Sequence, residues 1–321
     1  MLFIGCDVSK RTLDVSFQQN ARSRRFSNTR GGFADLVRWI EKHGDGTACV
    51  ILEATCVYHL PVSEYLAEHG VQVLVANPAR AHSFASAQGL RNKNDKLDAD
   101  TLGRFGRSLD LARVHLYQPN KKIINQLKAL LKRYTQVEKD LQRERNRLEK
   151  CTFIPDSDLS ARSIERQVAH LEAERDLLQV EIRKLIHSDE RLKHDDQLLR
   201  SITGIGPTTA PWLLMLLHEN RFSSARQLAA FLGLTPRHRS SGTKVQRGQI
   251  PNDCDRRLRA RFYYPAVTAQ THDPNFRALH QRLISNGRTQ KQALTAVMRK
   301  LVHVAFGVIK HQTEYNPEMA S

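Results

Sequence analysis

The sequence predicts an α/β fold in the first third of the chain and a mostly helical fold in the rest. Short apolar runs alternate with helical patterns over residues 1–115, which is typical of a mixed sheet covered by helices. Residues 116–195 are rich in Lys, Arg, Glu and Gln, with Leu and Ile at three- and four-residue spacing. Residues 196–321 hold helical patterns separated by Gly and Pro. We therefore expect three domains with these boundaries.

The N-terminal elements follow from the apolar pattern and its glycine breaks. Gly31 and Gly70 interrupt the pattern, and glycine commonly ends or separates regular elements. Strands are expected at 2–8, 10–17, 24–27, 48–52 and 71–76, and helices at 33–43 and 57–69. Three strands and a helix followed by strand–helix–strand–helix indicate a mixed sheet.

Residues 91–100 concentrate three carboxylates and three cations before an apolar-periodic helical segment. Read as the start of a helix, this stretch places Asp95 and Asp98 on one face. Two such carboxylates repel each other unless a cation lies between them, and Mg²⁺ prefers oxygen ligands of this kind. The alternative is a solvated first turn that Asp95 caps and the helix dipole favours. The cations Arg91 and Lys93 are expected to contact nucleic acid.

Two further acids lie near the ends of predicted strands, Asp7 in the first and Glu53 at the end of the fourth. A buried carboxylate costs free energy unless it has a partner. A mixed sheet can bring these two acids close to Asp95 and Asp98. Such a cluster binds two divalent ions and activates a nucleophile against a phosphodiester. The alternative is that the four acids lie apart, and each then has only a structural role.

Composition restricts the class of partner. The chain has 50 Lys and Arg against 33 Asp and Glu, a net charge of +17, which favours a polyanion such as nucleic acid. Residues 196–321 alone have 18 against 7, a net of +11, so the main contact is expected there. The five cysteines form no Cys-x-x-Cys pair, which indicates reduced thiols without a zinc site. No membrane-length apolar run or signal peptide is expected, which favours a cytoplasmic protein without a membrane partner.

Two long helices are expected in the middle third, at 121–150 and 159–186, with a break at Pro155. Their heptad-like spacing is typical of an antiparallel coiled-coil arm. Such an arm serves dimerisation or spaces two domains, and it says little about chemistry.

A turn at Gly204-Ile205-Gly206-Pro207 separates two helical runs. One interpretation is a helix-hairpin-helix, in which backbone amides near Gly204 and Gly206 bind a phosphate. The other is a helix C-cap followed by a proline at the next N-terminus. The turn lacks the third glycine and the preceding strand of a dinucleotide site, and the chain has no G-x-x-x-x-G-K-[ST] loop, so ATP use is not expected.

A serine lies among cations further along the chain. Ser241 precedes a glycine, and Arg237, Arg239 and Lys244 are close to it. Cations lower the cost of a serine alkoxide and stabilise charge on a phosphoryl group, so this serine is a candidate nucleophile. The alternative is an ordinary Ser-Ser-Gly turn, and the neighbouring Ser240 is a second possible hydroxyl.

A basic helix is expected after this loop, with Arg256, Arg257, Arg259 and Arg261 against a nucleic-acid backbone. Residues 275–309 are expected to be helical and amphipathic. The last dozen residues have the composition of a frayed end.

The whole chain resembles the DEDD transposases of the IS-one-ten family, which are bridge-RNA-guided recombinases, and their DNA-invertase relatives. The motifs that carry the resemblance, in order, are Ile4-Gly5-Cys6-Asp7-Val8-Ser9-Lys10, Leu52-Glu53-Ala54-Thr55, residues 90–99, Gly204-Ile205-Gly206, Phe231-Leu232-Gly233-Leu234-Thr235-Pro236 and Ser241-Gly242. Cys56 stands where the family has a glycine. The acid itself is unchanged, and the departure is expected to affect the local turn.

The resemblance implies a RuvC-like (RNase H-like) N-terminal domain, a coiled-coil arm and a C-terminal transposase domain. It also implies that Asp7, Glu53, Asp95 and Asp98 bind Mg²⁺, with two ions expected, and that Ser241 forms a covalent serine–phosphate intermediate. The partners it implies are double-stranded donor and target DNA, a non-coding guide RNA and further copies of the chain in a dimer or tetramer. The expected location is the cytoplasm of a bacterial or archaeal cell, at the nucleoid.

Two other functions are compatible with the same residues. A hydrolytic nuclease of the Holliday-junction type would use the four acids with water as the nucleophile and would not need Ser241. A non-catalytic nucleic-acid-binding protein would carry the acids as surface charges. Substitution of Ser241 and Asp7 separates the three.

Overall fold

A computed structural model of the chain describes its residues with few gaps. The described residues are 1–17, 22–43, 47–54, 57–89, 99–111, 114–219, 222–236, 240–241, 244–245 and 254–319. They fold as two compact units, Met1–Pro119 and Asn120–Ser321. The long central helices belong to the second unit together with the C-terminal helices.

The first unit is built on a mixed sheet of five strands in the order β3-β2-β1-β4-β5. The strands are β1 (Leu2–Val8), β2 (Thr12–Phe17), β3 (Arg22–Ser27), β4 (Ala48–Glu53) and β5 (Gln72–Ala76). The pairs β1–β2 and β2–β3 are antiparallel, whereas β1–β4 and β4–β5 are parallel. The expected mixed sheet is therefore confirmed.

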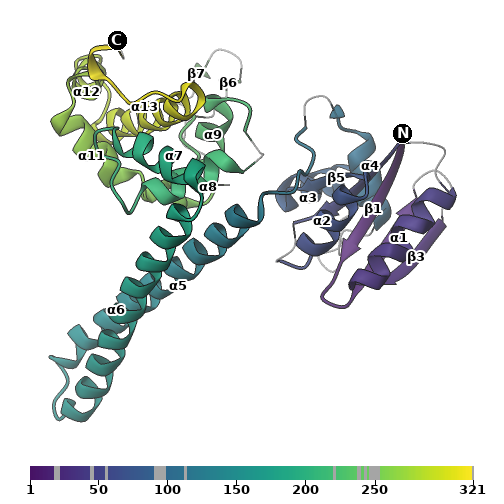
Figure 1. Cartoon of the computed structure of the whole chain (residues 1–321), viewed down its shortest axis with the longest axis horizontal. Helices are drawn as coiled ribbons and strands as arrows, with labels where there is room; N and C mark the ends of the chain where they lie inside the picture. The colour runs from purple at the N-terminus through teal and green to yellow at the C-terminus, as the bar shows by residue number, and fades with distance from the viewer. Residues whose placement is uncertain are drawn as a thin grey trace. The chain divides into compact units, whose positions relative to one another are not determined.

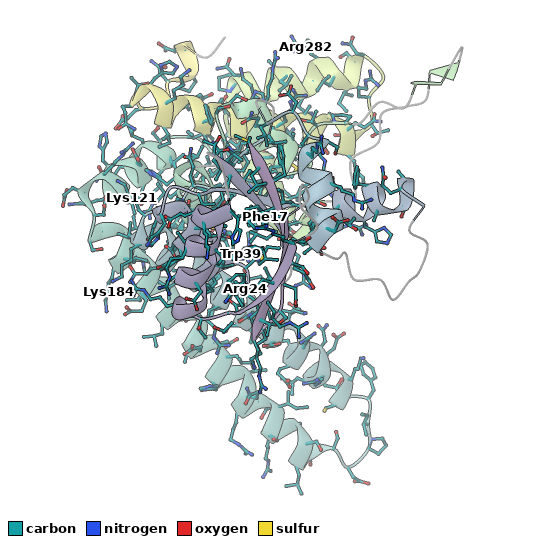
Figure 2. All side chains as sticks on the ribbon, turned by 90° about the vertical axis from the view of Figure 1, so that its right-hand side faces the viewer. Phe17, Arg24, Trp39, Lys121, Lys184 and Arg282 are labelled. Atoms are coloured by element: carbon teal, nitrogen blue, oxygen red, sulfur yellow. The ribbon has the colours of Figure 1, made fainter. Side chains whose placement is uncertain are left out.

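Each face of the sheet buries a separate apolar cluster, because successive side chains along a strand point to opposite faces. On one face, alternate strand residues pack with helices α1 (Arg30–His43) and α2 (Leu60–Glu68). Phe17 and Trp39 pack against each other there, with ring centroids 4.2 Å apart and ring planes tilted by 31° (Figure 2). The other face packs against α3 (Pro78–Ala87) and α4 (Ala99–Arg107).

The apolar pattern did not predict helix α3, although the sequence at its start carries a clear signal. The side chain of Asn77 accepts hydrogen bonds from the backbone amides of Ala79 and Arg80, and Pro78 occupies the first turn. Both features stabilise a helix N-terminus. Its small residues, such as the fully buried Ala81, give a weak apolar signal.

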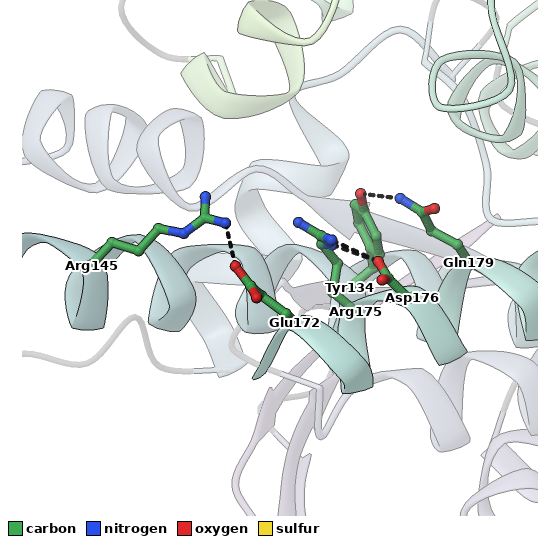
Figure 3. A network of polar contacts seen from close by, with 6 residues as sticks. All are labelled: Tyr134, Arg145, Glu172, Arg175, Asp176 and Gln179. Carbon is green, nitrogen blue, oxygen red and sulfur yellow. Dashed lines mark hydrogen bonds and ion pairs between the residues drawn. The ribbon is translucent and has the colours of Figure 1, made fainter. Parts of the chain in front are cut away.

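The predicted pair of long helices is confirmed as α5 (Lys122–Cys151) and α6 (Asp158–His187). They are antiparallel, and Figure 3 shows two polar contacts between them. Arg145 donates to Glu172 at 2.5 Å, and Gln179 donates to the Tyr134 hydroxyl at 2.9 Å. Beneath these contacts lie buried side chains at helical spacing, including Leu127, Leu131, Val137, Leu141, Leu171, Leu178 and Ile182. We refer to α5 and α6 together as the helical arm.

The rest of the second unit is mostly helical and shares one apolar core with the helical arm. Its elements are α7 (Glu190–Arg200), α8 (Ala210–His218), α9 (Ala225–Phe231), β6 (Ser240–Ser241), β7 (Lys244–Val245), α10 (Arg256–Ala260), α11 (Tyr263–His272), α12 (Pro274–Ser285), α13 (Gln290–His311) and a 3₁₀ turn at Pro317–Met319 (Figure 1). The chain end is held, because the Asn275 side chain donates to the carbonyl of Pro317 and the Tyr315 amide donates to Ser201 Oγ at 2.8 Å.

Residues 275–309 form two helices where the amphipathic pattern suggested one continuous stretch. Gly287 has φ +75° and ends α12, since a left-handed residue cannot continue a helix. Thr289 and Gln292 then form a capping box that starts α13. By length and composition α13 would suffice to cross a membrane. Its buried residues, however, belong to the apolar core of the second unit, as expected for a core helix.

Candidate active site

Asp7 and Glu53 lie next to each other at the carboxyl edge of the sheet. The register of the parallel pair β1–β4 ends at Cys6 and Leu52, and the two acids are the next residues on these strands. Cys6 and Leu52 are fully buried on the face of α1 and α2. Because side chains alternate, both acids belong to the opposite face, which α4 covers. Both are half-buried.

Helix α4 rests directly on β1 because Gly5 has no side chain. A Cβ at Gly5 would lie 1.6 Å from the carbonyl oxygen of Ala99 and 2.6 Å from the amide nitrogen of Gly103. A Cβ at Gly106 would lie 2.4 Å from the side chain of Ile51 on β4. These approaches are possible only for glycine. Helix and sheet therefore meet backbone to backbone.

The start of α4 lies close to the two acids. Its first residue, Ala99, contacts Gly5, which is two residues before Asp7 on the same face of β1 and so about 7 Å away along the strand. Farther along α4, a Cβ at Gly106 would approach Phe3, so the helix runs away from Asp7. Helix α4 therefore begins near the acidic edge of the sheet.

The remaining acids of the predicted cluster precede that point. Asp95 and Asp98, together with the predicted contacts Arg91 and Lys93, lie outside the described residues. Asp98 is directly bonded to Ala99 in sequence, so it is tethered within one residue of the Gly5 contact. Among the described residues, no group of three or more His, Cys, Asp or Glu side chains is placed to hold a metal ion.

The sheet brings a further carboxylate, Asp14, opposite Asp7. The two are cross-strand partners in the antiparallel β1–β2 pair and so share a face. Asp14 accepts a hydrogen bond from Arg25 Nε at 2.7 Å. Sequence analysis did not identify Asp14. The signal was present, because Asp14 occupies a polar position in the alternating strand Thr-Leu-Asp-Val-Ser-Phe.

The thiol behind these acids is not a metal ligand. Cys6 is fully buried in the apolar cluster on the other face. Burial raises the pKa of the Cys6 thiol, and the negative charges of Asp7 and Asp14 raise it further. Burial also raises the pKa of Cys49, to about 11. Because the thiolate is the metal-binding form, both residues are neutral core side chains.

The turn with two glycines connects α7 and α8. Gly204 has φ +93°, and a Cβ there would lie 2.3 Å from the carbonyl oxygen of Pro265 in α11. Its conformation and its packing both require glycine. A Cβ at Gly206 would meet nothing within 4 Å. The packing of the turn therefore accounts for Gly204, and Gly206 remains the more accessible of the two predicted phosphate contacts.

The segment with the predicted nucleophile begins and ends at one place. Arg259 Nη1 lies 3.3 Å from the carbonyl oxygen of Gly233 and 3.2 Å from Cys254 Sγ. Gly233 has φ +67°, and a Cβ there would lie 2.3 Å from the same sulfur. We call the residues between Gly233 and Cys254 the serine segment. Within it, Ser241 pairs with Lys244 between the short strands β6 and β7.

Other predicted contacts in the serine segment are not described. Arg237 and Arg239 lie outside the described residues, and for Ser241 and Lys244 the structure describes the backbone but not the side chain. The glycine after Ser241 is outside the described residues as well.

The four arginines expected on one basic helix divide into two pairs. Arg256 and Arg257 are exposed on α10. Arg259 turns inward to the serine segment, and Arg261 donates to Glu138 Oε2 at 2.8 Å in α5. Arg261 also stacks over the ring of Trp212, 4.2 Å from its centroid. Of these four arginines, only Arg256 and Arg257 are exposed enough to face a polyanion. The helical spacing alone did not predict this division.

Comparison with known proteins covers both units. A family model of the IS110 (IS-one-ten) DEDD type, described as a transposase, matches residues 4–152, which include all four predicted acids. A second model, described as the transposase IS116/IS110/IS902 family, matches residues 196–281, which include Ser241.

Individual relatives match either nearly the whole chain or part of it. The pilin gene-inverting proteins of Moraxella bovis and Moraxella lacunata are each 31% identical to it over 321 residues, which covers 98% of this chain and 97% of theirs. An uncharacterised 43.6 kDa protein of insertion element IS110 from Streptomyces coelicolor is 31% identical over 123 residues, which covers 38% of this chain and 30% of the relative.

Proposed function

The chain belongs to the IS116/IS110/IS902 family of transposases and is a DNA transposase/recombinase, and on that premise we propose that it breaks and rejoins DNA through a serine–phosphate intermediate. Asp7, Glu53, Asp95 and Asp98 hold divalent metal, and Ser241 is the nucleophile. The observation that supports the metal site is the meeting of Asp7, Glu53 and the start of α4 at one edge of the sheet.

The acids suit Mg²⁺ by their chemistry. Carboxylate oxygens are the preferred ligands of this hard cation. When bound, the ion neutralises developing charge on a phosphoryl group. The half-buried position of Asp7 and Glu53 allows them to reach both an ion and solvent. The Asp14–Arg25 pair places a compensated charge beside them, so Asp14 does not add an unpaired negative charge to the site.

The proposed covalent step is a phosphoryl transfer. The Ser241 oxygen bonds to the phosphorus of one strand, and the bond from that phosphorus to a deoxyribose oxygen breaks. The serine proton leaves, and the released deoxyribose oxygen takes up a proton. Attack by the deoxyribose hydroxyl of another strand reverses these steps and frees the serine. The cations Arg237, Arg239 and Lys244 stabilise the charge on the phosphoryl oxygens.

We extend the proposal to the partners. By family resemblance, a non-coding RNA selects donor and target DNA, and the chain acts as a dimer or tetramer. The helical arm forms a coiled coil for assembly, the turn at Gly206 binds a phosphate as in a helix-hairpin-helix, and the functional domains are residues 1–115, 116–195 and 196–321. Ribonuclease treatment and the mass of the assembled protein test the RNA and the oligomer.

The central experiment detects protein covalently joined to DNA. The purified chain is incubated with Mg²⁺, RNA transcribed from the flanks of its gene and a plasmid carrying those flanks. We expect a protease-sensitive adduct with the wild type. Asp7→Asn should reduce it by about two to three orders of magnitude, because a metal ion supplies several kcal/mol of transition-state stabilisation. Ser241→Ala should abolish it.

Two variants serve as controls. Asp35→Asn removes an exposed carboxylate that pairs with Arg38 on α1, and it should leave the adduct unchanged. Ser240→Ala tests the neighbouring hydroxyl. Cleavage that persists in Ser241→Ala without an adduct would indicate a hydrolytic nuclease instead. Loss of the adduct in Ser240→Ala alone would assign the nucleophile to Ser240.

A further inference from the structure

An exposed strip of side chains runs along α10 and into α11. Its members are Arg256, Arg257, Ala260, Tyr263 and Tyr264, all of them exposed. The spacing of three and four residues places them on one face of a helical path. Tyr263 is 45% and Tyr264 77% exposed. Two adjacent tyrosines therefore present their rings to solvent beside two guanidinium groups.

The strip is continuous because the backbone stays nearly helical between the two helices. The amide of Arg261 donates to the carbonyl of Arg257 at 3.3 Å, and the amide of Phe262 donates to that of Arg259 at 3.1 Å. Phe262 is fully buried. The residues between the exposed positions thus anchor the strip in the apolar core, so the tyrosines stand on a fixed support.

The two rings have a defined geometry. The centroids of Tyr263 and Tyr264 are 5.4 Å apart and the ring planes are at 89°, an edge-to-face pair. An edge-to-face pair leaves ring faces open for another flat group.

Charge selects the class of ligand. Residues 196–321 hold 18 Lys and Arg against 7 Asp and Glu. Of these acids, Asp273 is fully buried and Asp255 caps α10 by accepting from the Arg257 amide. An apolar protein surface would gain little binding free energy from the surrounding positive charge. A nucleic-acid strand matches the charge through its phosphates and the exposed rings through its bases. Arg256 precedes Tyr263 by seven residues, about 10 Å along a helix, so one strand can contact both.

We propose that Tyr263 and Tyr264 form a stacking site for unpaired nucleobases and that Arg256 and Arg257 bind the phosphates of the same strand. A duplex hides its base faces, so the ligand is a single strand of DNA or RNA. The inference rests on the proposed function, in which strands are separated and exchanged. It adds a site for an unpaired strand that follows directly after the serine segment in the chain.

Binding to labelled oligothymidylate, oligouridylate and a duplex of equal length tests the proposal with the full-length protein. We expect Tyr264→Ala to weaken binding of a single strand by about 5- to 150-fold, the range measured for base–aromatic stacking. Tyr264→Phe keeps the ring and should bind like the wild type. The homopolymer that loses more affinity identifies whether the strand is DNA or RNA.

Salt dependence separates stacking from charge. Tyr264→Ala should leave the slope of log affinity against log salt unchanged, whereas Arg256→Gln should reduce it by about 0.7, the value for one single-strand phosphate. Phe153→Ala removes another exposed ring, 83% exposed between α5 and α6, and should have no effect on binding.

Three results would overturn the proposal. Tyr264→Ala would bind single strands like the wild type, or it would lose duplex affinity to the same extent, or it would change the mass of the assembled protein. The last result would make the tyrosines a contact between protein chains. Ser241→Ala should bind single strands normally, so loss of the covalent adduct and loss of stacking are separately visible.

Discussion

The two units treat their carboxylates in opposite ways. Among the described residues, every buried Asp and Glu lies in the helical second unit, and these acids are Asp195, Asp196, Glu219 and Asp273. Each has a partner or caps a helix, as Glu219 does with Lys128 at 2.6 Å. In the sheet unit, Asp7 and Glu53 are instead half-buried at strand ends. Full burial with a fixed partner marks a structural acid, whereas a half-buried acid at the end of a strand keeps contact with solvent.

The units also anchor their predicted active segments differently. Helix α4 is held on the sheet by backbone contact between Ala99 and Gly5. The two ends of the serine segment are joined by a side chain, since Arg259 contacts the carbonyl of Gly233 and the sulfur of Cys254. Backbone packing tolerates no added atom, whereas hydrogen bonds from one side chain can be partly replaced. Point mutations can test this difference.

The largest effect is expected at Gly5. In Gly5→Ala, the new methyl group would overlap the carbonyl of Ala99, so α4 must leave the sheet. We expect the free energy of unfolding to fall by about 3 kcal/mol, the upper part of the range for overpacking, and the covalent DNA adduct to disappear. Denaturant titration and the adduct assay measure both.

Gly31→Ala is the matched control for Gly5→Ala. A Cβ at Gly31 would meet nothing within 4 Å, and alanine is favoured over glycine in a helix by up to about 1 kcal/mol. This variant should be as stable as the wild type or more so. Full activity in Gly5→Ala would refute the backbone anchor.

A smaller effect is expected from a buried pair in the helical unit. Asp195 is fully buried, and it accepts from His218 Nε2 at 2.8 Å and from Gln312 Nε2 at 2.9 Å. Burial alone would raise its pKa, but the hydrogen bonds from His218 and Gln312 and the charges of His218 and Arg191 bring the pKa of Asp195 below its ordinary value. We expect Asp195→Asn to lower the free energy of unfolding at pH 7 by about 2 kcal/mol.

The pH dependence of that loss has a defined sign. Because the folded pKa of Asp195 lies below the unfolded one, its contribution is complete above about pH 4 and is lost as the pH falls through the folded pKa. The wild type and Asp195→Asn should therefore converge in acid. Asp196 is the contrast, since burial raises its pKa despite Arg200. Asp196→Asn should cost little at pH 7, and a loss equal to that of Asp195→Asn would contradict this view.

A third prediction tests the side-chain anchor. Arg259→Lys keeps the charge but removes Nη1, the nitrogen that contacts both the Gly233 carbonyl oxygen and Cys254 Sγ. We expect the rate of adduct formation to fall about tenfold, as one lost hydrogen bond of roughly 1.4 kcal/mol implies. Arg282→Lys, at an exposed position, should form the adduct at the wild-type rate. If the two variants behave alike, Arg259 does not hold the serine segment.

The smallest effect is expected at the surface of the helical arm. Arg145 and Glu172 are bonded at 2.5 Å, but their side chains are 47% and 39% exposed. Exposed ion pairs contribute about 0–1 kcal/mol, and salt screens them. A double-mutant cycle with Arg145→Gln and Glu172→Gln should give less than about 1 kcal/mol of coupling, and less at high salt. A larger coupling would show that polar contacts hold the arm as strongly as its apolar core does.

The sequence predicted most of the element types because apolar spacing depends on local structure. Strands β1, β4 and β5 and the long helices α5 and α6 lie close to their expected positions. The pattern did not resolve α3, whose small side chains give little periodic signal. It also did not separate α12 from α13, because the break depends on the left-handed conformation of Gly287.

Some features of the candidate site were likewise predictable from the sequence, and others were not. The acids Asp7 and Glu53 were identifiable at the ends of apolar runs, and the strand register makes them neighbours. The pairing of Asp14 with Asp7 and the inward contact of Arg259 were not predictable, because they depend on cross-strand pairing and on a contact between residues 26 positions apart. No spacing rule distinguishes an inward arginine from an outward one on so short a helix as α10.

The amino-acid order by itself determined the excess of positive charge in the last third, predicted the kinds of element and supplied the candidate acids and hydroxyls for phosphoryl chemistry. Only the tertiary structure decided which of them meet. The reason is physical: local patterns reflect the period of one helix or strand, whereas the contact of Ala99 with Gly5 and the exposure of Tyr264 depend on how separate elements pack.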